Sequence, residues 1–161
     1  MSEKEQRSGM PKFDITDEAV IDSQPVKVYN AFLNELSGIT QWWMPHLQCK
    51  SRDGKLIDCE GGIFDATIHP HSILKARVCC KITKIVEAKS ITVEYISGDF
   101  LGTGEYNFEP IDVRTKIKFR FKVRSNNPLA YIVSPFMDIA KGHSDVMQHG
   151  FKNCNAYLEQ C

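Results

Sequence analysis

The chain has 161 residues, with 20 basic and 20 acidic side chains and a formal net charge of zero. This length suits one domain that buries a core without metal ions or disulfides, and the balanced charge gives no electrostatic footprint for nucleic acid or an anionic membrane surface. Charged residues interrupt the apolar stretches well short of the roughly 20 residues that span a bilayer, and residues 1–9 are too polar for a signal peptide. We therefore expect a soluble, cytoplasmic protein with a flexible tail over residues 1–11 and one folded domain over residues 12–161.

The first predicted element is a strand over Phe13–Asp22, where apolar residues alternate with polar ones. Ser23 is the expected N-cap of the helix that follows, and Pro25 suits its first turn because no backbone N–H is needed there. The helical period ends at Ser37-Gly38. Residues 39–44 are compatible with a second short helix before Pro45.

Turn-forming residues then recur at strand-like intervals as far as Val123. No helix-length segment separates the strands, so we expect them to be antiparallel. In the last of them apolar and basic residues alternate strictly, which predicts one dry and one wet face. The main predicted strands are Ile63–Ile68, Ala76–Val86, Ile91–Ile96, Thr103–Phe108 and Thr115–Val123.

After Asn126-Asn127-Pro128 the apolar period becomes helical and continues to Leu158. Pro135 interrupts it, so we expect a short helical turn before this residue or a kink at it. His143 lies on the apolar stripe and should face the sheet, where its imidazole needs a hydrogen-bond partner. A role in the core without ligand contact is the alternative for His143.

Cysteines and histidines give no sign of a metal centre or a cofactor. The six cysteines lack the spacing of a disulfide framework, and a chain of this size needs no covalent staples, so we expect reduced thiols. His69 and His71 flank Pro70, but no third ligand stands at an obvious spacing. The sequence therefore predicts no metal site and no cofactor.

Four segments, in this order, resemble the START-like helix-grip superfamily (Bet v 1-like, SRPBCC), most closely its polyketide cyclase/dehydrase-like branch. The segments are Ile21–Tyr29, Trp42–Pro45, Gly98–Pro110 and His143–Gly150. The resemblance implies an α+β helix-grip fold, in which a curved antiparallel sheet of about seven strands wraps around a long C-terminal helix, with one or two short helices after the first strand. It also implies an elongated apolar cavity, in which members of the superfamily hold lipids, sterols, isoprenoid quinones, hormones or polyketide intermediates.

Strand parity assigns side chains to the inner face of such a sheet without help from the resemblance. Gly102 and Gly104 share this face, where a missing side chain leaves room for a ligand or the helix. Trp42 and Trp43 lie outside the strands, and we expect them near the cavity mouth, one of them buried and the other gating access. The expected ligand-binding residues are Trp42, Trp43, Phe64, Val78, Cys80, Val93, Tyr95, Tyr106, Phe108, Ile117, Phe119, Phe121, Phe136, Ile139, His143 and Met147.

The leading functional hypothesis is binding or carriage of a small lipophilic molecule, whether lipid, isoprenoid or polyketide-like, in an internal apolar cavity. One alternative is a cyclase, aromatase or dehydratase acting on a polyketide-like substrate in the same cavity, with His143 as a weak catalytic candidate and no convincing catalytic constellation around it. Another alternative is a protein-interaction or co-chaperone module, which would require an exposed apolar patch. The sequence names no protein partner.

Overall fold

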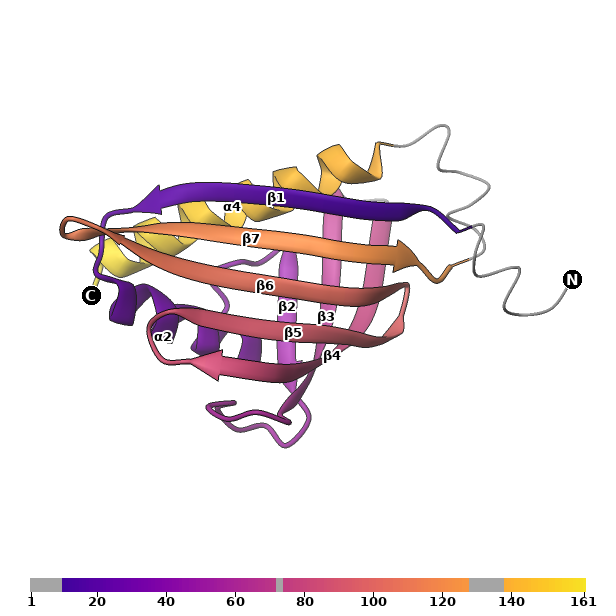
Figure 1. Cartoon of the computed structure of the whole chain (residues 1–161), viewed down its shortest axis with the longest axis horizontal. Helices are drawn as coiled ribbons and strands as arrows, with labels where there is room; N and C mark the ends of the chain where they lie inside the picture. Colours follow the sequence, from indigo (N-terminus) through magenta and orange to yellow (C-terminus); the bar gives the residue numbers. More distant parts are fainter. Residues whose placement is uncertain (1–9, 72–73, 128–137) are drawn as a thin grey trace, which may run out of the picture.

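The computed structural model describes residues 10–71, 74–127 and 138–161. Seven strands form one antiparallel sheet in the order β1-β7-β6-β5-β4-β3-β2 (Figure 1). The elements are β1 (Lys12–Ile21), α2 (Pro25–Ser37), β2 (Leu47–Ser51), β3 (Ile63–His71), β4 (Leu74–Val86), β5 (Ser90–Gly98), β6 (Phe100–Ile111), β7 (Arg114–Ser125) and α4 (Ile139–Glu159). Among the described residues, no helix combines the length and apolar character needed to cross a bilayer.

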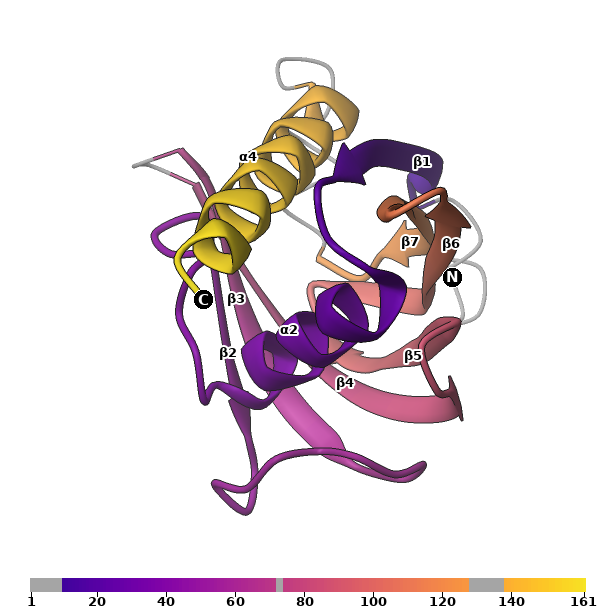
Figure 2. The ribbon, with the colours of Figure 1, turned by 90° about the vertical axis from the view of Figure 1, so that its left-hand side faces the viewer.

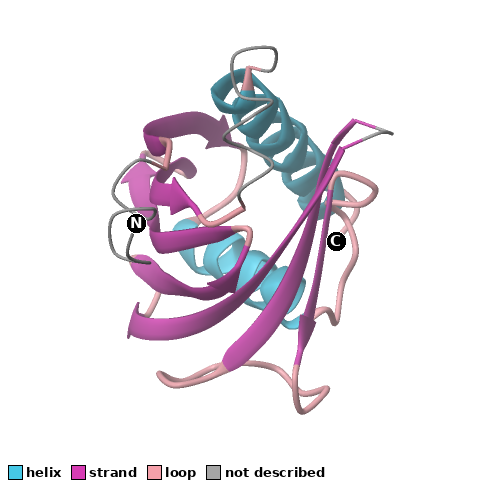
Figure 3. Ribbon diagram, turned by 90° about the vertical axis from the view of Figure 1, so that its right-hand side faces the viewer, coloured by secondary structure: helices cyan, strands magenta, loops and turns pink. Residues whose placement is uncertain are grey.

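The sheet curls, and both helices lie on its concave side (Figures 2 and 3). Helix α4 contacts β1, which is one edge of the sheet, and β3, which is next to the other edge. Helix α2 contacts β2 and β6 and also touches α4. The two helices therefore close the open side of the sheet, and the predicted α+β helix-grip architecture is confirmed.

Strand β7 shows why the sequence forms this sheet. Its inward residues Ile117, Phe119 and Phe121 are at most 1% exposed. On the outer face, the Arg120 guanidinium donates two hydrogen bonds to the Asp14 carboxylate of β1, at 3.0 and 2.8 Å. Alternation of apolar and charged residues thus places one set of side chains in the core and the other in water, as the sequence predicted.

Three register shifts accompany the curvature of the sheet. The register of β3 against β4 shifts between Ile68 and His71, and the register of β4 against β5 shifts at Cys79/Cys80 and again at Ile82/Lys84. An extra residue in one strand bends it and increases its twist. These shifts lie in the part of the sheet opposite β1, where the strands must turn back toward α4.

Three local expectations differ from the structure or fall outside it. The N-cap of α2 is Gln24 rather than Ser23, and it makes no side-chain capping bond. Residues 42–46 form turns rather than a second helix, because a helix is disfavoured just before Pro45 and the Glu35 carboxylate accepts from the backbone N–H groups of this segment. The predicted turn or kink at Pro135 lies outside the described residues.

A tryptophan inserted against a helical glycine joins the loop after α2 to α4. Trp43 is fully buried, and its indole Nε1 donates a 2.8 Å hydrogen bond to the Val146 carbonyl. A Cβ added at Gly150 would lie only 1.9 Å from Trp43 Cε2. Gly150 therefore lets the indole ring pack directly on the backbone of α4.

Gly150→Ala should destabilise the fold by about 1–3 kcal/mol, because Trp43 must shift from a tightly packed position. Gly142→Ala is the matched control in the same helix, since a Cβ there would meet only the Pro70 ring, whose Cβ lies at an ordinary 3.4 Å. This control should gain up to about 1 kcal/mol from the higher helix propensity of alanine. Urea unfolding measures both values, and equal effects of the two substitutions would contradict the packing role of Gly150.

Candidate ligand cavity

An internal cavity lies between the concave face of the sheet and α4. Its walls are mainly apolar side chains from β2 to β7, together with residues of both helices. The expected ligand-binding residues that line it are Phe64, Val78, Cys80, Val93, Tyr95, Tyr106, Phe119, Phe121, His143 and Met147. Strand parity and the helical stripe thus bring these residues to one space, and ligand contact by them stays a prediction.

Six further residues line the cavity and were not among those expected: Leu36, Leu47, Cys49, Ala66, Ile68 and Val146. Ala66 and Ile68 share the parity of Phe64 on β3, and Val146 lies on the apolar stripe of α4, so a stricter use of the same patterns finds them. Leu47 and Cys49 are buried residues that alternate with exposed ones on the five-residue strand β2. This strand is too short to give a strong periodic signal.

The remaining expected residues that the structure describes pack elsewhere. Phe32 of α2 is fully buried, and its ring packs against those of Trp42, Trp43 and Phe108. Ile117 is fully buried in the core, and Ile139 is half-buried at the start of α4, while Phe136 lies outside the described residues. The aromatic cluster centred on Phe32 therefore fills one end of the space between sheet and helices.

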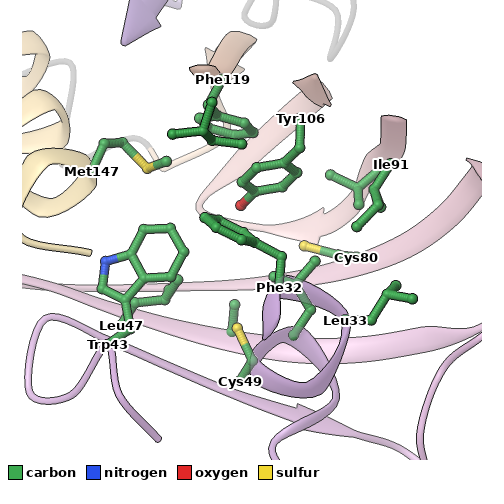
Figure 4. Close-up of a cluster of buried hydrophobic side chains, with 14 of the residues drawn as sticks. Phe32, Leu33, Trp43, Leu47, Cys49, Cys80, Ile91, Tyr106, Phe119 and Met147 are labelled. Atoms are coloured by element: carbon green, nitrogen blue, oxygen red, sulfur yellow. The ribbon is translucent and has the colours of Figure 1, made fainter. Parts of the chain in front are cut away.

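The cavity is small, with about 30 Å³ open to the centre of a water molecule. One water needs roughly 10–15 Å³ on this measure, whereas ligand sites commonly reach about 300 Å³ or more. Buried side chains from the sheet and from both helices point toward one another in this region (Figure 4). The room expected over Gly104 is also filled, because the Phe119 ring and the Tyr95 hydroxyl lie about 3 Å from where its Cβ would stand.

One carboxylate and one imidazole form a buried polar pair beside the cavity. The Asp17 side chain from β1 is 8% exposed and that of His143 from α4 is 9% exposed, with 3.6 Å between Oδ2 and Nδ1. This distance is too long for a direct hydrogen bond, and neither atom has a hydrogen-bond partner within the described chain. The His143 ring also stacks on Phe121, with 4.0 Å between ring centroids. His143 thus faces the sheet as predicted, and its partner Asp17 was not foreseen.

Asp17 remains ionised in this setting. Burial opposes its negative charge, but polar interactions with His143, Ser144 and Gln148 outweigh burial and hold the pKa of the carboxyl below its ordinary value of 3.8. Because Nδ1 of His143 faces this carboxylate, Nε2 is the ring nitrogen left for a molecule in the cavity. The carboxylate can therefore orient the imidazole, and the pair has the groups needed for proton transfer.

A second buried carboxylate holds the segment Thr40–His46, which we term the tryptophan loop. Glu35 is 1% exposed, and its oxygens accept from Trp42 N at 2.9 Å, Thr40 Oγ1 at 3.2 Å and Trp43 N at 3.5 Å. Burial raises the pKa of Glu35, and these three donors offset part of that shift. The carboxylate therefore ties the tryptophan loop to the end of α2.

The tryptophan loop also contacts α4. Besides the bond from Trp43 to the helix backbone, the His46 ring stacks on that of His149 at 4.3 Å between centroids. Trp42 stacks on Trp43 and on Tyr157. Trp43 is fully buried and Trp42 is partly buried, so the loop lies where the two helices meet, directly before Leu47, which lines the cavity.

Histidine and cysteine side chains do not gather into a metal centre in the described part of the chain, since no three potential ligands lie close enough to one another. All six cysteines are free thiols. Cys49 and Cys80 line the cavity, and burial raises the pKa of both thiols. They therefore act there as small apolar side chains.

Solved structures match nearly the whole chain at low sequence identity. A protein from Thermus thermophilus is 12% identical, and the match covers 90% of this chain and 99% of the other with a TM-score of 0.69. A START superfamily protein from Mycobacterium smegmatis is 13% identical, with coverages of 93% and 99% and a TM-score of 0.67. Ara h 8.0201 is 18% identical, with coverages of 94% and 100% and a TM-score of 0.60.

The chain has the START-like, Bet v 1-like fold. No family model matches it, and no curated protein matches its sequence. At these identities the shared START-like fold fixes the architecture and leaves the activity open. The likeness to the polyketide cyclase/dehydrase-like branch therefore stays a hypothesis.

Asp17→Asn should lower the free energy of unfolding by about 1–3 kcal/mol at neutral pH, since it removes the buried carboxylate charge that interacts with His143, Ser144 and Gln148. Because the folded-state pKa of Asp17 is lowered from 3.8, the stabilisation by ionised Asp17 is complete above pH 3.8 and is lost as the pH falls through the lower folded-state pKa. The difference in the free energy of unfolding between wild type and variant should therefore shrink only below pH 3.8. Urea unfolding from about pH 6 to about pH 2.5 measures it, and a constant difference over this range would contradict the assignment.

Proposed function

We propose that the protein binds a small lipophilic molecule in this cavity. The observation that carries the proposal is an internal space between sheet and α4 with an almost wholly apolar lining and a buried Asp17–His143 pair at its side. Burying apolar ligand surface contributes about 25 cal/mol per Å². Such a lining therefore favours a greasy molecule that has few polar groups.

Binding requires the cavity to widen beyond its present volume of about 30 Å³. Met147, which lines it from α4, is unbranched and has three rotatable side-chain bonds, so it can change shape at little cost. The tryptophan loop is held more firmly, by hydrogen bonds to Glu35 and by the buried Trp43 ring on α4. We infer that displacement of Met147 widens the cavity for the ligand.

We propose that this function is carried out in the cytoplasm. Cys49, Cys79, Cys80 and Cys154 are free and buried, and Cys59 and Cys161 are free and exposed. Free thiols persist in reducing compartments, whereas an oxidising environment promotes disulfides.

Ala66→Leu tests whether the cavity is the binding site, because it fills this small space from β3. N-phenyl-1-naphthylamine, a neutral apolar fluorophore, should bind the wild-type protein saturably with enhanced emission, and the variant should bind it at least about tenfold more weakly. Ala156→Leu is the control, since Ala156 is exposed on α4. Circular dichroism checks the fold, as overpacking costs about 1–3 kcal/mol. Equal affinity of the wild type and Ala66→Leu would exclude this cavity as the site.

A second candidate function is an acid–base enzyme of the cyclase or dehydratase type in the same cavity. The Asp17–His143 pair favours it, because a carboxylate that orients an imidazole is a common arrangement for proton transfer. Cys49, Cys80, Tyr95 and Tyr106 also line the cavity, but burial raises the pKa of all four, so none of them is an ionised nucleophile at neutral pH. The pair therefore supports at most a proton-transfer step.

Mass spectrometry of molecules recovered from detergent-free protein separates the two functions. If the protein only binds, wild type and His143→Phe should retain the same compound, since phenylalanine keeps an apolar ring on Phe121. If it catalyses a reaction, the variant should retain a compound that differs from the wild-type one by the elements of water or by a ring closure. Identical compounds in both would contradict catalysis through His143.

A further inference from the structure

Two phenol hydroxyls belong to the lining of the cavity. Tyr95 of β5 is 8% exposed and Tyr106 of β6 is 4% exposed, and both line the cavity. The Tyr95 hydroxyl lies over the inner face of β6, 3.0 Å from where a Cβ of Gly104 would stand. The Tyr106 hydroxyl points toward the centre of the buried cluster (Figure 4).

Neither hydroxyl donates a hydrogen bond to any residue in the described part of the chain. Both phenol oxygens keep some accessible surface, since neither is among the fully enclosed polar atoms that lack a hydrogen-bond partner in the described chain. Packing alone does not explain the oxygens, because phenylalanine would fill nearly the same volumes. The two tyrosines therefore retain polar atoms that the folded protein itself does not use.

The two hydroxyls are suited to act as donors. Burial raises the pKa of Tyr95 and that of Tyr106 well above the ordinary value of 10.0, so both stay protonated at neutral pH. A carbonyl oxygen has two lone pairs and can accept from both. A carboxylate fits poorly, because no lysine or arginine stands among the described residues that line the cavity and an uncompensated buried charge is expensive.

We propose that Tyr95 and Tyr106 donate hydrogen bonds to a carbonyl oxygen of the bound molecule, so that the cavity takes lipophilic ketones in preference to hydrocarbons of the same shape. This assignment rests on the proposed function, since it requires that a lipophilic molecule occupy the cavity. The apolar walls then supply most of the binding free energy, and the two hydroxyls decide which molecule is held and in which orientation.

Two small probes of nearly equal shape, 1-indanone and indane, test the assignment by protein-detected NMR titration. Wild-type protein should bind the ketone more tightly than the hydrocarbon by roughly 10- to 30-fold, as two hydrogen bonds of ordinary net strength allow. The double variant Tyr95→Phe/Tyr106→Phe should lose this preference and retain its affinity for indane. Tyr29→Phe is the control, because Tyr29 is also 4% exposed but packs on Phe108 away from the cavity.

The infrared carbonyl stretch of bound 1-indanone provides a second measurement. It should shift to lower frequency in the wild type and in Tyr29→Phe, relative to the ketone in hexane, and the shift should disappear in the double variant. A ketone preference or a frequency shift that survives in the double variant would overturn the role of the hydroxyls while leaving the cavity as the binding site. If wild-type protein binds neither probe, the proposed function fails and this assignment fails with it.

Discussion

The packing of α4 across the open side of the curled sheet is the contact on which the rest of the structure depends. A sheet with one apolar face must cover that face, and here the cover reaches from β1 at one edge to β3 near the other. One helix is narrower than the concave surface it spans, so aromatic side chains must fill the difference. Phe32, Phe119 and Phe121 do so, and what they leave unfilled is the cavity.

The tryptophan loop completes this closure at the junction of the two helices. Trp43 packs on the bare backbone of Gly150 and bonds to the Val146 carbonyl, while Glu35 fixes the backbone of the loop from the other side. A buried carboxylate is costly, and here three donors offset the cost because they would themselves be unpaired without it. The loop is thus held both by these directional contacts and by the apolar packing of the fully buried Trp43 ring.

The fold was predictable from the sequence because its strongest signals are local. On β7, the alternation from Thr115 to Val123 indicates which side chains are buried. On α4, the apolar stripe that contains His143 indicates which side of the helix faces the sheet. Resemblance in four ordered segments then supplied the topology, which periodicity alone does not give. Element boundaries were harder to predict, as the turns over residues 42–46 show, since there a hydrogen bond from the Trp42 backbone N–H to the Glu35 carboxylate decides the backbone conformation. The polar part of the site was harder to predict, because Asp17 on β1 and His143 on the last helix are linked by no local pattern. The cavity volume was likewise beyond prediction, because it depends on the rotamers of aromatic side chains from several elements rather than on which face each residue occupies.

The buried polar groups differ from the apolar core in what they contribute. Apolar residues around the cavity can be exchanged for others of similar volume at a modest cost in stability. They therefore determine that a cavity exists, but say little about which molecule would occupy it. Asp17 and His143 each hold a buried polar atom without a hydrogen-bond partner in the described chain, at a cost that an apolar residue would avoid. Stability alone gives no reason to place this pair beside the cavity. The proposed ligand would account for the arrangement, because it would bring polar partners to the imidazole.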